Sequence, residues 1–194
     1  MDWIEWEDTE EETIDINEQF KNEVKTIKRD GIDKLLEWLE ESDFYKAPAS
    51  TRHHLAWEGG LVEHSMNVLV TARKFNQALD DPVDDESLTL VSLFHDLGKH
   101  QYYKKDFYKP KYLKSGELAK TPYERNKNLI SVPHEISSVH ILSKYIELTE
   151  DETWAILQHN GMYSDLKCQL QGKETQLQSI VHWADMWASR FIEN

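Results

Sequence analysis

The stretch Phe94-His95-Asp96-Leu97-Gly98-Lys99 decides how this sequence of 194 residues is interpreted. It places a histidine and an aspartate directly after an apolar run, just before Gly98 relaxes the backbone. A buried carboxylate costs free energy unless a positive charge compensates it. Imidazole and carboxylate are also groups that divalent first-row metals bind. We therefore predict that His95 and Asp96 are metal ligands.

Further residues of the same chemical type lie in or beside other apolar, helix-like stretches: His64, His134, His159 and Asp185. A single histidine in a helix is more often a surface residue or a hydrogen-bonded core residue than a ligand. Several such groups in separate helices are harder to explain in that way. Adjacent helix residues differ by about 100° in direction, so His95 and Asp96 can both contact an ion that lies between them.

Apolar residues at helical spacing predict an all-α fold. The expected helices are 17–29, 32–39, 61–79, 85–98, 134–147, 150–159 and 173–192, with a loop at 43–57. The last helix carries an apolar face that runs from Leu177 to Phe191, with Asp185 beside it. Residues 101–132 are rich in Tyr and Lys and lack a helical period, so they predict a small β-hairpin or an ordered loop.

The net charge of −14 is unevenly distributed. Residues 1–20 hold nine acids and no Lys or Arg, and we expect an acidic N-terminal tail, or a flap that docks through its two tryptophans. Residues 21–194 are expected to form one helical domain. The overall acidity argues against binding duplex DNA. It leaves a small phosphorylated substrate open, because a bound metal changes the local sign of the charge.

The expected location is the cytoplasm. No apolar run approaches the roughly 20 residues of a membrane span, so we expect no membrane association. The first residues do not resemble a secretion signal, and the single cysteine, Cys168, cannot form an internal disulfide. A homodimer is a further expectation, since dimers are the commonest soluble oligomers.

Five short segments, in this order, resemble the motifs of the HD-domain metal-dependent phosphohydrolase superfamily. They are Gly59-Gly60-Leu61-Val62-Glu63-His64-Ser65, Phe94-His95-Asp96-Leu97-Gly98-Lys99, Pro133-His134-Glu135, Gln158-His159-Asn160-Gly161 and Ala184-Asp185-Met186-Trp187-Ala188-Ser189. The similarity runs from about residue 44 to 191. It is nearest to small stand-alone HD proteins of bacteria and phages, which places the chain in a bacterial or phage-infected cell. The HD part of certain bacterial 3′-to-5′ exoribonucleases is also similar.

The resemblance implies an HD-type helical bundle that binds one or two divalent metal ions, with Mn²⁺, Fe²⁺, Co²⁺, Ni²⁺ and Mg²⁺ all acceptable. By the same resemblance His64, His95, Asp96 and Asp185 bind the first ion. His134 and His159 bind the second, and Asp96 is shared between the two. The implied activity is hydrolysis of a phosphoester or phosphoanhydride bond of a nucleotide or short oligonucleotide by a metal-activated water.

Three polar groups near these motifs are candidates for substrate chemistry. Lys99 lies four residues after His95, where it can neutralise a phosphate or simply interact with the helix dipole. Arg52 and His54 precede the first motif, and His54 is a candidate proton donor to the leaving group; a solvated loop is the alternative. Lys104 belongs to a run of Lys, Tyr and Phe that suits phosphate binding and base stacking, or is an ordinary exposed hairpin.

Two other functions remain open from the sequence. A site with two metals and six ligands also resembles the di-iron oxygenases that share this fold. A binding module that keeps its metal for stability, and engages a protein through the acidic segment, is the third hypothesis.

Overall fold

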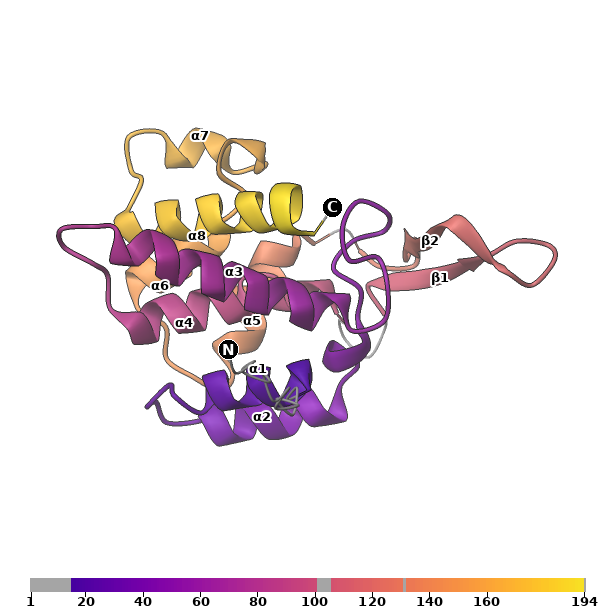
Figure 1. Cartoon of the computed structure of the whole chain (residues 1–194), viewed down its shortest axis with the longest axis horizontal. Coiled ribbons are helices and arrows are strands. Elements are labelled where there is room, and N and C mark those ends of the chain that lie inside the picture. The colour runs from indigo at the N-terminus through magenta and orange to yellow at the C-terminus, as the bar shows by residue number, and fades with distance from the viewer. Residues whose placement is uncertain (1–14, 101–105, 131, 194) are drawn as a thin grey trace, which may run out of the picture.

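The computed structural model describes residues 15–100, 106–130 and 132–193, and it confirms a helical fold with one small hairpin (Figure 1). The helices, in chain order, are α1 (Ile16–Val24), α2 (Ile32–Glu41), α3 (Gly60–Gln77), α4 (Asp85–Phe94), α5 (His134–Leu142), α6 (Glu150–Leu157), α7 (Lys167–Leu170) and α8 (Gln176–Trp187). The strands are β1 (Tyr108–Tyr112) and β2 (Leu118–Arg125). Short 3₁₀ turns lie at Phe44–Lys46, Leu97–Lys99 and Gly161–Tyr163, and a π-helical turn lies at Ala188–Ile192.

Helix α3 is the centre of the bundle, and it packs against α1, α4 and α8 (Figure 1). Helix α6 packs against α4, α5 and α8, and α5 packs against the turn Leu97–Lys99. The helices that carry the predicted ligands therefore surround a common interior. This is the arrangement that a site built from several separate segments needs.

Aromatic side chains join the first helices to this interior. Helix α1 begins at Ile16, and its Phe20 is fully buried. The Phe20 ring lies with its centroid 5.2 Å from that of Phe44 and 5.7 Å from that of Phe94. Such edge and tilted contacts add to the free energy gained from burying the rings. Residues 1–14 of the predicted acidic segment lie outside the described residues.

A buried ion-pair network connects the loop after α1 to α4 and α6. The Arg29 guanidinium donates to Glu152 at 2.5 Å and to Glu86 at 2.8 Å. Glu152 has no exposed surface, and it also accepts hydrogen bonds from the Ser87 hydroxyl and from the backbone N–H of Thr149. The latter contact completes a capping box at the start of α6.

The strands β1 and β2 form the predicted hairpin, which projects from one end of the body (Figure 1). They pair antiparallel, with Tyr108 opposite Arg125. At the base of the hairpin the Asn126 side chain donates to the backbone oxygen of Asp106, and its own N–H donates to the backbone oxygen of Phe107. These bonds join the two ends of the hairpin to each other at its root.

The end of the last helix differs from its prediction. Leu177, Ala184 and Ala188 are buried as expected, but Phe191 is 67 % exposed, so its predicted place on the apolar face is wrong. The physical reason is the change from α-helix to a π-helical turn at Ala188, which lowers the rotation per residue and turns Phe191 away from the core. None of the described helices is long and apolar enough to span a membrane.

Candidate metal centre

The structure brings all six predicted ligands together at the centre of the bundle. His64 lies on α3, His95 and Asp96 follow α4, His134 is the first residue of α5, His159 follows α6, and Asp185 lies on α8. His64, His95, Asp96 and His159 are almost completely buried, whereas His134 and Asp185 are partly exposed. The cluster is thus rigidly supported and reachable from one side.

One oxygen of Asp96 faces the first predicted set. Its Oδ2 lies 3.5 Å from Nε2 of His64 and 3.5 Å from Nε2 of His95. The same His64 nitrogen lies 3.2 Å from Oδ1 of Asp185. These are the four residues assigned to the first ion.

The other oxygen of Asp96 faces the second predicted set. Its Oδ1 lies 3.1 Å from Nε2 of His134 and 3.4 Å from Nε2 of His159. The two histidine nitrogens are 3.3 Å apart. Asp96 therefore stands between the two groups, one carboxylate oxygen directed to each.

The tautomers show why these atoms need a cation. Nδ1 of His95 donates to the backbone oxygen of Ser92 at 2.9 Å, and Nδ1 of His159 donates to that of Ile156 at 2.8 Å. In the neutral form of each ring, Nε2 is then left with a lone pair. Those lone pairs face the carboxylate of Asp96, so acceptors point at acceptors.

The distances between the ligand atoms, and their lack of hydrogen-bond partners, fit a divalent ion. Nε2 of His64, Nε2 of His95 and Oδ1 of Asp96 are buried without a hydrogen-bond partner among the described residues. Two ligand atoms that are each about 2.1 Å from one ion lie roughly 3.0 to 3.4 Å apart. The separations of 3.1 to 3.5 Å lie within or close to this range. The donor set therefore suits one or two ions, with nitrogen and oxygen ligands that do not select among the expected metals.

A carboxylate that was not predicted from the sequence completes the His64 environment. Glu193 lies 3.0 Å from Nδ1 of His64 and 2.6 Å from Nδ1 of His54, and it accepts a hydrogen bond from the Asn67 amide at 3.1 Å. It directs Nε2 of His64 to the cluster. Glu63, the sequence neighbour of His64, instead accepts a bond from the Trp57 indole at 3.3 Å.

The turn after Asp96 packs closely against α5, and Gly98 is the residue at the contact. A Cβ at Gly98 would lie 2.2 Å from the backbone oxygen of His134 and 2.7 Å from Cβ of Ser137. The Ser138 hydroxyl accepts the Gly98 N–H and donates to the backbone oxygen of His95, both at 2.8 Å. Glycine at 98 thus lets the segment with Asp96 reach the helix with His134.

Neighbouring charges keep the Asp96 carboxylate ionised, and burial keeps the His95 ring neutral. Burial lowers the pKa of His95 to about 4. Burial alone would raise the pKa of Asp96, but the Lys99 ammonium at 2.5 Å and the surrounding histidines hold it well below its ordinary value. Asp96 in turn raises the pKa of Lys99 above its usual range, against the effect of burial.

His64 and Glu193 form a second coupled pair. Burial lowers the pKa of His64, but the neighbouring carboxylates of Asp185 and Glu193 outweigh it and raise that pKa to about 10. For Glu193, hydrogen bonds from His54 and His64 outweigh burial and lower its pKa to about 2. A metal ion at Nε2 of His64 would take the place of a proton.

The predicted substrate residues lie in different surroundings. Lys99 is bound to Asp96, and the His54 ring lies with its centroid 5.0 Å from that of His64. Arg52 is exposed and donates to His53, so its role in substrate binding stays a prediction. Lys104 lies outside the described residues.

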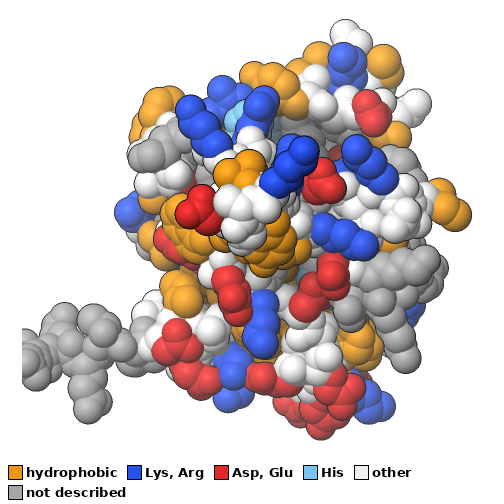
Figure 2. All heavy atoms as spheres, turned by 90° about the vertical axis from the view of Figure 1, so that its right-hand side faces the viewer, with side chains coloured by type: hydrophobic (Ala, Val, Ile, Leu, Met, Phe, Trp, Pro, Cys, Tyr) orange, Lys and Arg blue, Asp and Glu red, His pale blue; other side chains and the backbone are white. Residues whose placement is uncertain are grey.

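A cavity of about 440 Å³ opens beside the metal centre. Lys99 and His134 line its inner part together with Asn160, and the hairpin supplies Tyr108 and Arg125. Figure 2 looks onto the end of the molecule from which the hairpin projects; Lys and Arg gather mainly in the upper half of this face, and Asp and Glu mainly in the lower half.

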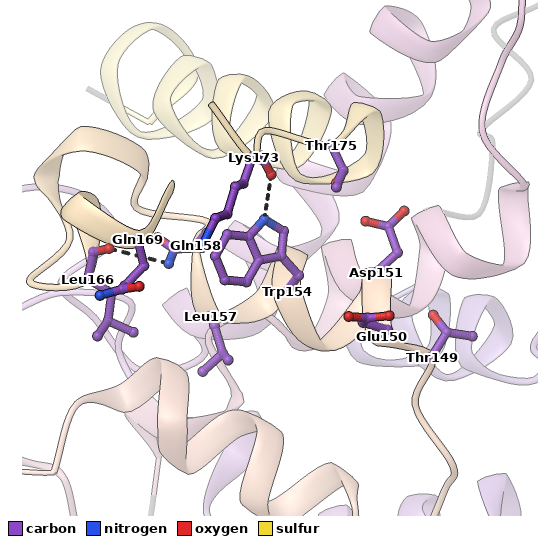
Figure 3. Close-up of a pocket in the computed structure, with 10 residues that line it drawn as sticks. All are labelled: Thr149, Glu150, Asp151, Trp154, Leu157, Gln158, Leu166, Gln169, Lys173 and Thr175. Atoms are coloured by element: carbon purple, nitrogen blue, oxygen red, sulfur yellow. Dashed lines mark hydrogen bonds between the residues drawn. The ribbon is translucent and has the colours of Figure 1, made fainter. Parts of the chain in front are cut away.

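A larger cavity of about 720 Å³ lies elsewhere, between α6 and α7 (Figure 3). Its wall includes Trp154, whose indole donates to the backbone oxygen of Lys173, and the buried Gln158, whose amide donates to the backbone oxygen of Leu166. None of the predicted site residues that the structure describes lines it, and the groups of described residues that could hold a metal lie outside it. The candidate metal centre instead borders the smaller cavity, through Lys99 and His134.

The fold and the site define a helical protein whose converging His and Asp side chains could hold a metal ion. The family model of the HD domain matches residues 61–186, which span the ligands from His64 to Asp185. The chain therefore belongs to the HD-domain family, whose members are generally metal-dependent hydrolases. No curated protein and no solved structure matches the chain.

Proposed function

We propose that this protein is a metal-dependent phosphohydrolase that cleaves a phosphoester or phosphoanhydride bond of a nucleotide or short oligonucleotide. The observation that carries the proposal is the position of Asp96, with one oxygen facing each half of a buried ligand cluster and Lys99 bound beside it. Lys99 also lines a cavity large enough for a nucleotide, together with His134 of the cluster.

A divalent ion held by these residues would lower the pKa of a bound water and would polarise a phosphoryl oxygen. The chain's own groups do the rest. Lys99 places a fixed positive charge where negative charge develops on the phosphoryl oxygens. His54, with Nδ1 held by Glu193, keeps Nε2 available to donate a proton to the leaving oxygen. The apolar wall behind His95 keeps bulk water away from the cluster.

The test is turnover by purified protein loaded with Mn²⁺, against a panel of nucleoside mono-, di- and triphosphates, cyclic dinucleotides and short RNA. We expect release of phosphate, pyrophosphate or nucleotide from at least one member. His95→Ala combined with Asp96→Ala should abolish that turnover, whereas Asp81→Ala, an exposed aspartate, should leave it unchanged. No product from any member of the panel would exclude the proposal.

His54 has its own matched control. We expect His54→Ala to lower kcat by roughly 10²- to 10⁴-fold, the usual contribution of a general acid. His53→Ala removes an exposed neighbouring imidazole and should have little effect. Equal losses in the two variants would remove the proposed role of His54.

The same cluster supports a second candidate, because Asp96 faces two histidine-rich groups as a bridging ligand of two iron ions does. Aerobic, iron-loaded protein that consumes O₂ in the presence of a substrate would favour this oxygenase chemistry. Turnover of a phosphate ester by the Mn²⁺- or Mg²⁺-loaded protein, without O₂ uptake, would favour hydrolysis.

A further inference from the structure

The cavity beside the metal centre contains two cationic side chains with different surroundings. Lys99 lies at its inner end, where its ammonium is bound to Asp96 at 2.5 Å. Arg125 lies at its outer end, exposed, with its guanidinium carbon 5.0 Å from the centroid of the Phe107 ring. Two positive charges along one cavity are the arrangement that an extended anion requires.

Arg125 differs from the arginines that stabilise the fold. Arg29 and Arg73 each form ion pairs with two carboxylates. No carboxylate in the described part of the chain forms an ion pair with Arg125, and its guanidinium has no hydrogen bond there. Its planar set of donors, supported by an aromatic face, has no hydrogen-bond partner among the described residues, and this geometry suits phosphate better than a lysine does.

The hairpin root holds Arg125 in this position. Tyr108 and Arg125 are opposite residues of β1 and β2, so their side chains lie on one face of the ladder. Burial raises the pKa of Tyr108, while Lys99 and Arg125 both act to lower it, which places this phenol near both cations. The buried Asn126 joins the two strands at this root through its bonds to the backbone of 106 and 107.

Carboxylates also line the cavity, so the cations decide whether an anion can enter. Glu135 accepts a bond from Asn160 at 3.0 Å and lies 3.4 Å from Nδ1 of His134. Asp165 lies on the same wall. Lys99 is already paired with Asp96. Among the described residues that line the cavity, Arg125 is therefore the Lys or Arg side chain whose charge no carboxylate compensates.

We propose that Arg125 forms a subsite for a second phosphate, so that the preferred substrates carry a phosphate beyond the one that is attacked. Nucleoside diphosphates, triphosphates and dinucleotides belong to this class, and nucleoside monophosphates do not. The attacked phosphate lies by Lys99 and the metal centre, and the second lies over the hairpin root. This inference rests on the proposed hydrolytic function and names its substrate class.

The first experiment compares the Mn²⁺-loaded wild type with Arg125→Ala, Arg125→Lys and Lys111→Ala. Lys111→Ala removes an exposed charge from the same hairpin and is the matched control. For substrates with two phosphates, Arg125→Ala should raise KM by at least about tenfold with little change in kcat, since charged hydrogen bonds are lost. Arg125→Lys should recover only part of this loss. Monophosphate hydrolysis should change by less than about twofold.

The second experiment measures binding without turnover. Titration of methylenediphosphonate and methylphosphonate, at fixed free Mn²⁺, should show that Arg125→Ala weakens only the ligand with two phosphonate groups. If the wild type hydrolyses no phosphate ester but this difference is found, the proposed function fails and the subsite stands. The subsite is wrong and the function stands if the wild type hydrolyses esters but Arg125→Ala has the same KM as Lys111→Ala. The same conclusion follows if Arg125→Ala weakens the binding of both phosphonates equally. Absence of diphosphonate binding to the wild type also overturns the subsite.

Discussion

The Glu193 carboxylate lies 3.0 Å from Nδ1 of His64, and this contact joins the C-terminal π-helical turn to the metal centre. The same carboxylate holds His54. One side chain therefore orients both a metal ligand and the candidate proton donor, although the two histidines lie on different segments. Partners of this kind fix the tautomer and direction of a ligand and raise its basicity.

Glu193→Gln should lower Mn²⁺ affinity by roughly 10- to 100-fold, because the charge that supports His64 is lost while the side-chain volume is retained. Isothermal titration of the metal-free protein measures this directly. Glu174→Gln, a change of an exposed glutamate, is the control and should bind Mn²⁺ as the wild type does. Equal affinities of wild type and Glu193→Gln would show that the carboxylate does not support the ligand.

His134→Ala combined with His159→Ala should reduce the bound metal from two ions to one per chain. These histidines face only Oδ1 of Asp96, so the other half of the cluster keeps its ligands. Asp96→Ala should reduce binding in both halves. Elemental analysis after gel filtration counts the ions. Full retention of two ions by the double variant would contradict the assignment.

Gly98→Ala should weaken the second half of the cluster as well as the fold. The added methyl group would meet the backbone oxygen of His134 at 2.2 Å, which forces α5 away from Asp96. We expect a loss of roughly 1–3 kcal/mol in unfolding free energy, measured in urea, and fewer than two ions per chain. Gly116→Ala, where no atom lies within 4 Å, tests backbone strain alone and should keep both ions. Unchanged stability and metal content in Gly98→Ala would refute the close approach.

Glu152→Gln should destabilise the protein by about 3–5 kcal/mol near neutral pH, because it leaves the Arg29 guanidinium without its buried partner. Hydrogen bonds from Arg29 and Ser87 outweigh burial and lower the pKa of Glu152 below its ordinary value of 4.5. The ionised carboxylate therefore stabilises the fold above that value, and the contribution is lost as pH falls through the native pKa.

Urea unfolding at several pH values checks this dependence. The difference in unfolding free energy between wild type and Glu152→Gln should be constant above about pH 5.5 and should shrink below about pH 4.5. Glu150→Gln, an exposed neighbour on the same helix, should show neither effect. A difference that does not vary with pH would mean that packing, rather than charge, connects these helices.

The predicted ligands were accessible from the sequence because they interrupt apolar helices. His64, His95 and Asp96 lie in or directly after apolar helical stretches, Asp185 lies beside an apolar face, and the structure brings the four together. Glu193 gave no such signal. It follows Asp185 by eight residues, which in a regular α-helix places it about 80° away. Only the π-helical turn, which no residue pattern announces, brings it to His64.

The substrate side of the site was harder to predict for a related reason. The sequence indicated a hairpin within 101–132, but not which residues face each other across it. The pairing of Tyr108 with Arg125 depends on a register that shifts between Pro110 and Tyr112. The role of Arg125 therefore became visible only from the three-dimensional arrangement.

The separation of the ligands along the chain has a consequence for biosynthesis. A ribosome that has just added Asn160 has already produced His64, His95, Asp96, His134 and His159, but neither Asp185 nor Glu193. The partly made chain thus lacks a carboxylate of the first half and the group that orients His64. The full set of candidate ligands therefore exists only after α8 has been added, so that a nascent chain completes this set at the same time as its final packing.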